Sequence, residues 1–306
     1  MNLMSCKQSM VYKLAVLGLS LGLSISALAN DLSTTESLAR QGRANAQTEL
    51  AMRYLEGTDT KQNYTQAKYW LEQAAAQGDP AAQYNLGWMY MDGAGVQQDY
   101  SKAMAWYLKA ANQGHAIAQY NIGWMFEDGM GVEQDYSEAA KWFEKSAILG
   151  LVDAQNSIGV RYAKGQGVQQ DYSKALDWFI KAAGQGSTNA MTQLGVLYYH
   201  GYEVAQDYVK AAQWYRKAAE QDNADAQYNL AMMYYEGEGV PQDYDKSMAL
   251  LKKVDPRLAA QAQYSLAVMY AQGSGLPQND ALSKAWFKKS CDSGHPDACT
   301  HTQDAN

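Results

Sequence analysis

Hydrophobic and polar residues follow one another with helical spacing along most of this chain of 306 residues, and the pattern returns every 36 residues. Four aligned columns carry the period without an insertion: an alanine, a glycine, a tryptophan and an aromatic column. Their members are Ala46, Ala82, Ala118, Ala154, Ala190, Ala226, Ala262 and Ala298; Gly57, Gly93, Gly129, Gly165, Gly201, Gly237 and Gly273; Trp70, Trp106, Trp142, Trp178, Trp214, Leu250 and Trp286; and Tyr54, Tyr90, Phe126, Tyr162, Tyr198, Tyr234 and Tyr270. This regularity predicts a repeat protein, because short amphipathic units bury their apolar faces only against their neighbours.

Each unit is expected to contain two helices, as residues 79–114 illustrate. Asp79 is a good N-cap, Pro80 suits the first helical position, and Gly93 ends the helix. The core face of this first helix is expected to carry Ala82, Leu86, Gly87 and Tyr90. The second helix follows Asp99 and ends near Gly114, and its buried stripe is expected to be Ala103, Trp106, Tyr107 and Ala110. The sequence therefore predicts an all-α fold, a right-handed α/α superhelical solenoid of about seven 36-residue helix-turn-helix repeats.

The first 29 residues are predicted to be a signal peptide rather than part of the fold. Lys7 and Lys13 precede an apolar run from Leu14 to Ala27, and Ala27-Leu28-Ala29 has the small-x-small pattern of a cleavage site. The run is shorter than the about 20 residues of a comfortable membrane span. We therefore expect cleavage after Ala29 and no stable membrane span afterwards; an uncleaved amino-terminal anchor is the alternative.

The repeat phase extends beyond both ends of the array. Gly42 lies 36 residues before Gly78, so Ser33 to Gln41 is expected to be a lone second-type helix that covers the first repeat. Ala298 opens a first-type helix that has no helix after it. The expected organisation is a signal peptide (1–29), an amino-terminal capping helix (30–43), seven repeats (44–294) and a truncated carboxy-terminal repeat or tail (295–306).

The sixth repeat departs from the others. Asp222 stands where a glycine is expected, Leu250 replaces the tryptophan, and Val254-Asp255-Pro256 is expected to end the second helix early. Because the count of 36 residues survives, a local change of superhelix curvature is expected, and a flexible joint is the alternative.

The repeat units resemble a known family. Residues 82–114, AQYNLGWMYMDGAGVQQDYSKAMAWYLKAANQG, and residues 118–147, AQYNIGWMFEDGMGVEQDYSEAAKWFEKSA, are similar to Sel-1-like repeats, relatives of the tetratricopeptide repeats. The resemblance extends from about residue 33 to about residue 300. It implies an α/α solenoid that acts as an adaptor between proteins. Bacterial members of the family are often exported and act in signalling, envelope assembly or host contact, and the family has no shared catalytic residues.

Two cysteines follow the predicted signal peptide. Cys291 has the phase of Ala75 at the end of a second-type helix, and Cys299 has the phase of Gln83 in the next first-type helix. These phases face each other, which favours a disulfide, as an oxidising compartment allows. The resemblance supports this pairing, since a cysteine-rich exported branch of the family has similar bridges. Free thiols and a metal site with His295 and His301 are the alternatives, although the spacing matches no common zinc motif. His115 and His200 are expected at solvated helix ends or loops.

Charge and motifs argue against several function classes. The 25 basic and 32 acidic residues give a net charge of -7, which disfavours nucleic acid as a partner. The sequence contains no zinc-protease helix motif, no nucleophile elbow, no phosphate-binding loop and no serine with lysine three residues later. We therefore expect a protein that is not an enzyme and has no cofactor and no metal.

The first helix of each repeat is expected to line the inner wall of the superhelix, and variable positions on it are candidates for binding. The candidate residues are Tyr84, Asn85, Trp88, Tyr120, Asn121 and Trp124. Exposed aromatic residues are typical anchors of interfaces, and the two asparagines have amide groups able to hold an extended peptide backbone. The alternative is structural, because a tyrosine that recurs at one phase also suits packing against the adjacent helix.

These observations favour an exported, non-catalytic adaptor that holds a protein or peptide partner in its concave groove, in the periplasm or after secretion. One alternative is an envelope immunity protein that sequesters a toxin. The other is a weak hydrolase of β-lactams or cell wall, which the motif search does not support.

Overall fold

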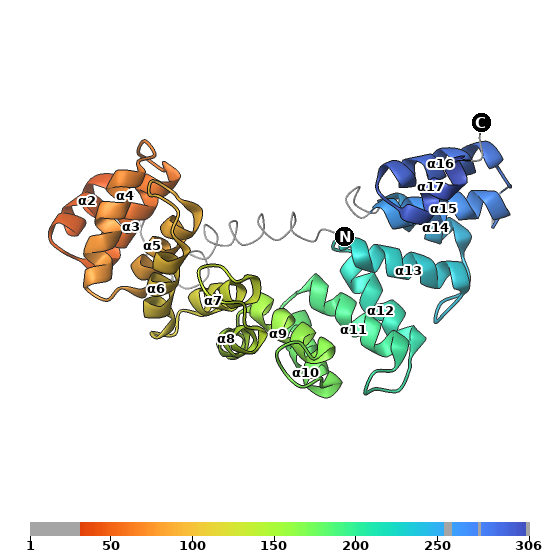
Figure 1. Cartoon of the computed structure of the whole chain (residues 1–306), viewed down its shortest axis with the longest axis horizontal. Coiled ribbons are helices and arrows are strands. Elements are labelled where there is room, and N and C mark those ends of the chain that lie inside the picture. The colour runs from red at the N-terminus through yellow and green to blue at the C-terminus, as the bar shows by residue number, and fades with distance from the viewer. Residues whose placement is uncertain (1–30, 254–258, 275–276, 304–306) are drawn as a thin grey trace. The chain divides into compact units, whose positions relative to one another are not determined.

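The computed structural model describes residues 31–253, 259–274 and 277–303 (Figure 1). Within these ranges the regular elements are all helices, so the predicted all-α repeat fold is confirmed. The predicted signal peptide (1–29) and the Val254-Asp255-Pro256 break lie outside the described residues. The chain divides into two compact units, residues 1–169 and 170–306, which are described separately.

The first unit contains eight helices in its described part, with second-type helices α2, α4, α6 and α8 alternating with first-type helices α3, α5, α7 and α9. Their bounds are α2 Leu32–Arg40, α3 Ala44–Glu56, α4 Tyr64–Ala76, α5 Pro80–Asp92, α6 Tyr100–Ala111, α7 Ala116–Asp128, α8 Tyr136–Ile148 and α9 Val152–Lys164. Each helix packs on the next in the chain, as expected of stacked helical hairpins.

The second unit continues the alternation, with second-type helices α10, α12, α14 and α16 and first-type helices α11, α13, α15 and α17. Their bounds are α10 Tyr172–Gly184, α11 Thr188–His200, α12 Tyr208–Ala219, α13 Ala224–Glu236, α14 Tyr244–Lys253, α15 Ala259–Gln272, α16 Asp280–Asp292 and α17 Pro296–Gln303. The short α17 lies where the sequence predicts the truncated first-type helix.

The helix ends follow the predicted capping residues. The Asp79 side chain accepts a hydrogen bond from the Ala82 amide at 2.8 Å, and the Asp99 side chain accepts one from Lys102 at 2.9 Å. Gly93 ends α5 with a φ of 75°, a left-handed conformation that glycine adopts without strain. At the amino-terminal end, α2 buries Thr35 and Ala39 and packs on α3, as expected of a capping helix.

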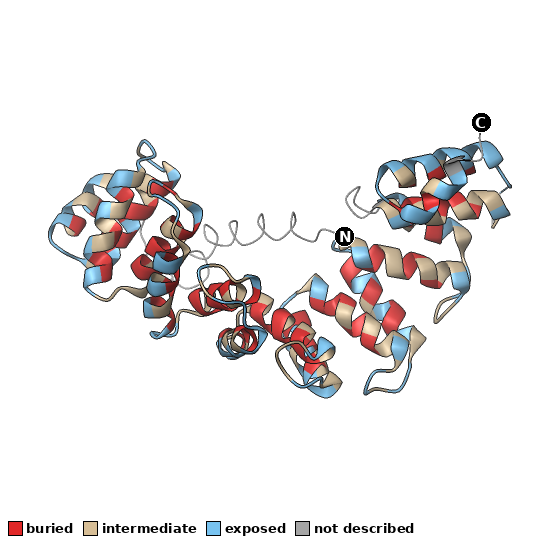
Figure 2. Cartoon of the chain, viewed as in Figure 1, coloured by how far each residue is buried: buried red, intermediate tan, exposed pale blue. Residues whose placement is uncertain are grey.

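Within each unit the core lies where neighbouring helices pack against each other (Figure 2). The eight members of the alanine column are 0–4% exposed, which lets neighbouring helices approach closely. The second-type helices contribute the large buried side chains Leu71, Tyr107, Phe143, Phe179, Tyr215, Leu251 and Phe287. Of the stripe predicted on α6, Ala103, Tyr107 and Ala110 are buried. Trp106 is only half-buried, because its ring lies on the surface beneath the Lys109 ammonium, 3.7 Å from the ring centroid.

Glycines of the first-type helices lie directly against these rings. A Cβ added at Gly87 would lie 2.5 Å from the Tyr107 ring, and one at Gly123 would lie 2.7 Å from Phe143. Both distances are too short for carbon atoms that are not bonded to each other. The glycine therefore admits the aromatic ring, and the ring fills the space that the missing side chain leaves.

Buried glutamines connect successive repeats of the first unit. Gln83 donates to the Ala75 carbonyl at 3.4 Å and accepts from Gln113 at 2.8 Å. Gln47 is held in the same way by Ala39 and Gln77. Gln119 donates to the Ala111 carbonyl at 3.0 Å, but its Oε1 atom is buried without a hydrogen-bond partner. In the next repeat the position equivalent to Gln77 and Gln113 is occupied by Leu149, whose side chain has no hydrogen-bond donor.

We expect Gly123→Ala to lower the free energy of unfolding by about 1–3 kcal/mol, because the new methyl group overpacks the Phe143 ring. Alanine favours the helix over glycine by about 1 kcal/mol. A loss of stability measured by chemical denaturation can therefore be assigned to the clash with the ring. Adding Phe143→Leu to this variant should restore part of the loss. The first repeat already has this combination, since Ala51 and Leu71 stand at the equivalent positions and pack together. An unchanged or higher stability of Gly123→Ala would contradict this account of the packing.

Candidate functional site

The six candidate binding residues lie on two neighbouring first-type helices of the first unit. Tyr84, Asn85 and Trp88 belong to α5, and Tyr120, Asn121 and Trp124 occupy the same phases on α7. The repeat therefore brings two equivalent sets together, as the sequence predicts. The exposure of the individual side chains differs from the expectation.

The two tyrosines are buried, so the expectation that they are exposed is wrong. Tyr84 is 4% exposed and Tyr120 is 9% exposed. The Tyr84 ring lies 5.6 Å from Tyr107 in its own repeat and stacks at 4.7 Å on His115 in the next. Burial raises the pKa of Tyr84 to about 12. The structure thus supports the alternative that the tyrosine column packs successive repeats together.

The two asparagines are also buried, which corrects the prediction that they present amides to a peptide. Asn85 is 4% exposed and its Nδ2 atom donates to the Ala81 carbonyl at 2.8 Å, one turn earlier in α5. Asn121 is 5% exposed, and its side chain lies beside the Tyr84 hydroxyl. Asn121 thus faces the preceding first-type helix, α5, and Asn85 shares its surroundings with Met52 and Leu55 of α3, so neither amide is presented on an open surface.

The two tryptophans are half-buried. The Trp124 indole packs edge-on against Phe143 at 5.5 Å and against Tyr120 at 6.0 Å. Trp88 instead borders a pocket. The two equivalent tryptophans therefore have different surroundings.

The pocket beside Trp88 has a volume of about 430 Å³. Its lining consists of Met52, Leu55, Glu56, Gln62, Tyr64, Asn85 and Trp88. Met52 and Thr48 in the first repeat stand where Trp88 and Tyr84 stand in the second, and they are smaller. The first repeat therefore leaves space that aromatic side chains occupy in the second and third repeats. Apolar side chains form most of the lining, while the Gln62 amide and the Glu56 carboxylate add polar groups. The pocket has a size and a composition typical of sites that take one bulky apolar group.

A buried ion pair connects two later first-type helices of the first unit. Glu127 on α7 and Arg161 on α9 are paired, each about 6% exposed, and Arg161 also donates to Gln166 at 2.6 Å. Sequence reasoning missed this pair, because Arg161 stands at a phase that carries Met89 and Met125 in the preceding repeats. Since the two charges neutralise each other inside the protein, we assign the pair a structural role.

His115 is not the solvated residue that the sequence predicts. It caps α7, where its Nδ1 atom accepts a hydrogen bond from the Ala118 amide at 3.2 Å, and its ring stacks on Tyr84. Burial lowers the pKa of His115, with Asp79 acting in the opposite direction. The capping hydrogen bond requires an unprotonated Nδ1. His200 is exposed at the end of α11, as expected.

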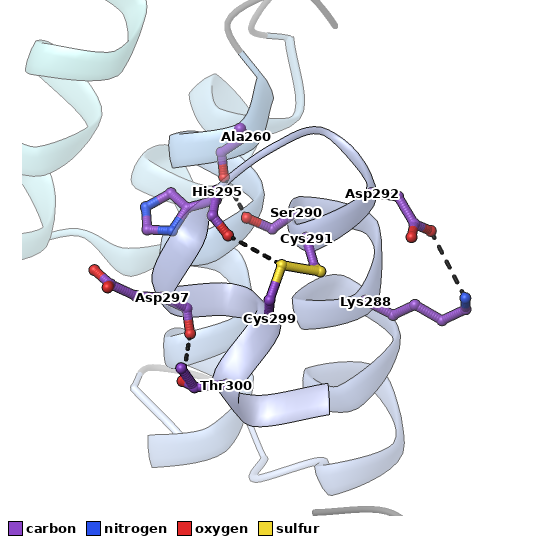
Figure 3. The surroundings of a disulfide bond; sticks show 9 residues. All are labelled: Ala260, Lys288, Ser290, Cys291, Asp292, His295, Asp297, Cys299 and Thr300. Atoms are coloured by element: carbon purple, nitrogen blue, oxygen red, sulfur yellow. Dashed lines mark hydrogen bonds and ion pairs between the residues drawn. A yellow bond between two sulfur atoms is a disulfide. The ribbon is translucent and has the colours of Figure 1, made fainter. Parts of the chain in front are cut away.

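Cys291 and Cys299 form the predicted disulfide (Figure 3). The bond joins the last turn of α16 to the middle of α17, and the two Cα atoms are 4.8 Å apart. Beside it, Ser290 donates to the Ala260 carbonyl at 2.6 Å. Within the described residues, no group of three or more histidine, cysteine, aspartate or glutamate side chains is arranged to hold a metal ion. The bridge therefore attaches the short last helix to its neighbour.

Comparisons with known proteins agree with the architecture. The fold and its period define the class as an α/α repeat protein built from helical hairpins. The Sel1 repeat model matches residues 44–79, 80–115, 116–151, 152–187, 188–223, 224–253 and 260–295. The chain belongs to the Sel1 repeat family.

Among the solved structures that are similar to this chain are the following two. One is a protective antigen of uropathogenic Escherichia coli strains with an SLR fold, at 39% identity and a TM-score of 0.82. The match covers 90% of this chain but 59% of that chain, so this protein spans about three fifths of the relative's length. The other is a Sel1 repeat protein from Oxalobacter formigenes, at 32% identity and a TM-score of 0.72, covering 80% of this chain and 96% of that chain. A search among curated proteins finds no match.

Among the described helices, none combines the length and the apolar character needed to cross a membrane.

We expect the stability of the protein to fall as the pH drops below about 6.5, the pKa of histidine in an unfolded chain. Because burial lowers the pKa of His115 in the folded state, the unfolded state binds protons first and folding favours the neutral ring. His115→Asn should reduce this dependence, since Asn223 caps α13 at the same phase by accepting from Ala226 at 2.9 Å. Thermal unfolding between pH 7 and pH 5 measures the effect. His200→Asn is the control, and equal pH profiles for His115→Asn and the parent chain would contradict the assignment.

Proposed function

We propose that this chain is a non-catalytic scaffold that binds another protein through the first repeats of its array. The observation that carries the proposal is the pocket between α3, α5 and the loop after α3. Sel1 repeat proteins generally bind proteins, and the pocket gives this chain a place where an apolar side chain of a partner fits. Of the six candidate residues, Trp88 has the surroundings best suited to contact it.

The lining of the pocket indicates which partner fits. Met52, Leu55 and Trp88 provide apolar surface for a leucine, methionine or aromatic side chain. The Glu56 carboxylate is exposed at the pocket and favours a basic or amide group in the same segment. The expected ligand is thus a short peptide segment in which an apolar side chain stands next to a hydrogen-bond donor.

Export to the periplasm or beyond the cell is part of the same proposal. Two features support it: the basic, apolar and small-x-small pattern of residues 1–29, and the Cys291–Cys299 disulfide, a bond that persists in oxidising compartments. Amino-terminal sequencing of the exported protein tests it, with Asn30 expected as the first residue. A chain that retains residues 1–29 in the envelope would contradict the cleavage.

We expect Trp88→Ala to weaken partner binding at least tenfold, because the variant removes the aromatic wall of the pocket. The measurement is capture from an envelope extract by the immobilised protein, with the partner then purified and its Kd determined by titration. Trp124→Ala is the matched control. It removes the same residue type at the same phase, and Trp124 is not part of the pocket lining.

Two results would reject the site. One is equal affinity of Trp88→Ala and the parent chain, with unchanged helical content by circular dichroism. The other is equal loss in Trp88→Ala and Trp124→Ala, which would indicate a general structural effect. Met52→Glu gives a second probe, since it introduces a charge into the apolar lining without removing the tryptophan.

A further inference from the structure

The loop between α11 and α12 departs from most loops of its type, and shares with the loop after α3, which has Asp59, a residue other than glycine at one position. Four of them carry a second glycine in the left-handed region: Gly95, Gly131, Gly167 and Gly239, with φ between 68° and 74°. At the equivalent position the α11–α12 loop has Glu203, with a φ of 54°. A glutamate held in this conformation is strained relative to glycine.

The glycines have a second role that Glu203 does not share. A Cβ at Gly167 would lie 1.9 Å from the Tyr136 carbonyl oxygen, and one at Gly239 would lie 2.3 Å from the Tyr208 backbone. These loops therefore touch the first residue of the preceding second-type helix. Because a side chain at residue 203 prevents the same close approach, the loop after α11 meets Tyr172 differently, through the ring of Tyr202.

Tyr202 belongs to a continuous row of aromatic rings in the second unit. Its ring stacks on Tyr172 at 4.6 Å, with an angle of 9° between the planes, and on His200 at 5.1 Å. His200 contacts Tyr199 at 5.0 Å, and Tyr199 contacts Tyr208 at 5.1 Å. Tyr202 is 39% exposed and His200 is also exposed. The row is therefore an aromatic surface at the loop edge, not part of the core.

Carboxylates surround this row. Glu203 is exposed beside Tyr202, and the Tyr199 hydroxyl donates to Glu238 at 2.6 Å. Glu236 lies close enough to Glu238 that burial and the neighbouring carboxylate raise the pKa of Glu236. Residues 199–209 and 235–245 contain no lysine or arginine. The lysines that follow, Lys210 and Lys246, are paired with Asp207 at 3.4 Å and Asp243 at 2.8 Å.

We propose that the aromatic row Tyr172, His200, Tyr202, Tyr199 and Tyr208, with Glu203, Glu236 and Glu238, binds a basic peptide segment of another protein. The face of a tyrosine ring attracts cations through its π-electrons, and three carboxylates without an ion pair in the described residues add a negative potential. Arginine is the preferred side chain, because its planar guanidinium both stacks on rings and pairs with carboxylates.

The geometry favours a peptide over a single small cation. Tyr172, Tyr202 and His200 stack face to face, and Tyr199 meets His200 and Tyr208 edge-on, so the rings do not enclose one ammonium group in a cage. An extended segment, by contrast, can place successive cationic side chains along the row. This surface consists of residues other than those of the Trp88 pocket, and its test does not depend on that pocket.

The test is a titration of the full exported chain with a fluorescein-labelled hexa-arginine peptide, followed by fluorescence anisotropy at 0.15 M salt. The main variant is Tyr202→Gln with Glu203→Gly, which copies Gln166-Gly167 of the α9–α10 loop. We expect it to weaken binding at least tenfold. It replaces a strained glutamate by glycine, so the loop is expected to fold.

A second variant separates specific binding from attraction between an acidic protein and a basic peptide. Tyr202→Gln alone leaves the net charge unchanged and should still weaken binding at least threefold. Tyr69→Gln is its matched control, because Tyr69 is an exposed tyrosine of the first unit, 50% exposed, and its loss should leave the Kd unchanged.

Three results would overturn the proposal. They are equal Kd values for Tyr202→Gln and the parent chain, equal weakening by Tyr69→Gln, and binding of tetramethylammonium as tight as that of hexa-arginine. The last result would assign the surface to a small organic cation.

Discussion

The contact between a small residue on one helix and a large ring on the next is the constraint on which the structure depends. Gly87 and Gly123 leave no room for even one methyl group against Tyr107 and Phe143. This contact fixes how closely the two helices of a repeat approach and which faces they present. The buried alanine column then lets the following repeat approach equally closely. A chain that repeats these residues every 36 positions has one way to stack, which explains why insertions are absent from the array.

Much of the architecture could be predicted from the sequence because local signals and tertiary packing agree. Asp79, Pro80 and Gly93 specify the ends of α5 by capping and backbone conformation alone. The pairing of Cys291 with Cys299 follows from the repeat phase, since equivalent positions on facing helices meet in every unit. The exposure of Tyr84 and Asn85 could not be obtained in this way. A helical wheel divides a helix into a core side and a solvent side, whereas a helix inside a stack has neighbours on three sides.

Departures from the repeat pattern carry more information about binding than the pattern itself. The tyrosine column recurs because the scaffold needs it: Tyr264 packs between Phe287 and His295 much as Tyr84 packs between Tyr107 and His115. The Trp88 pocket arises where Met52 stands in place of the tryptophan of the second and third repeats, and the aromatic row arises where Tyr202-Glu203 replaces a residue followed by glycine. Both substitutions are visible in the sequence, but the space and the ring contacts they produce depend on neighbouring repeats. The signal that sequence reasoning overlooked was the replacement of the second loop glycine, which occurs at Glu203 and also at Asp59.

The buried glutamines have a consequence for how the array loses structure. Gln47 and Gln83 each donate to a carbonyl of the preceding second-type helix and accept from a glutamine of their own repeat, so the amide that crosses to the preceding unit is also held from within its repeat. At Gln119 the second bond is missing, because Leu149 cannot supply it. Cooperativity between repeats in a linear array is set by such interfaces. The amide of the third repeat therefore keeps its bond to the preceding repeat but is anchored at one end only.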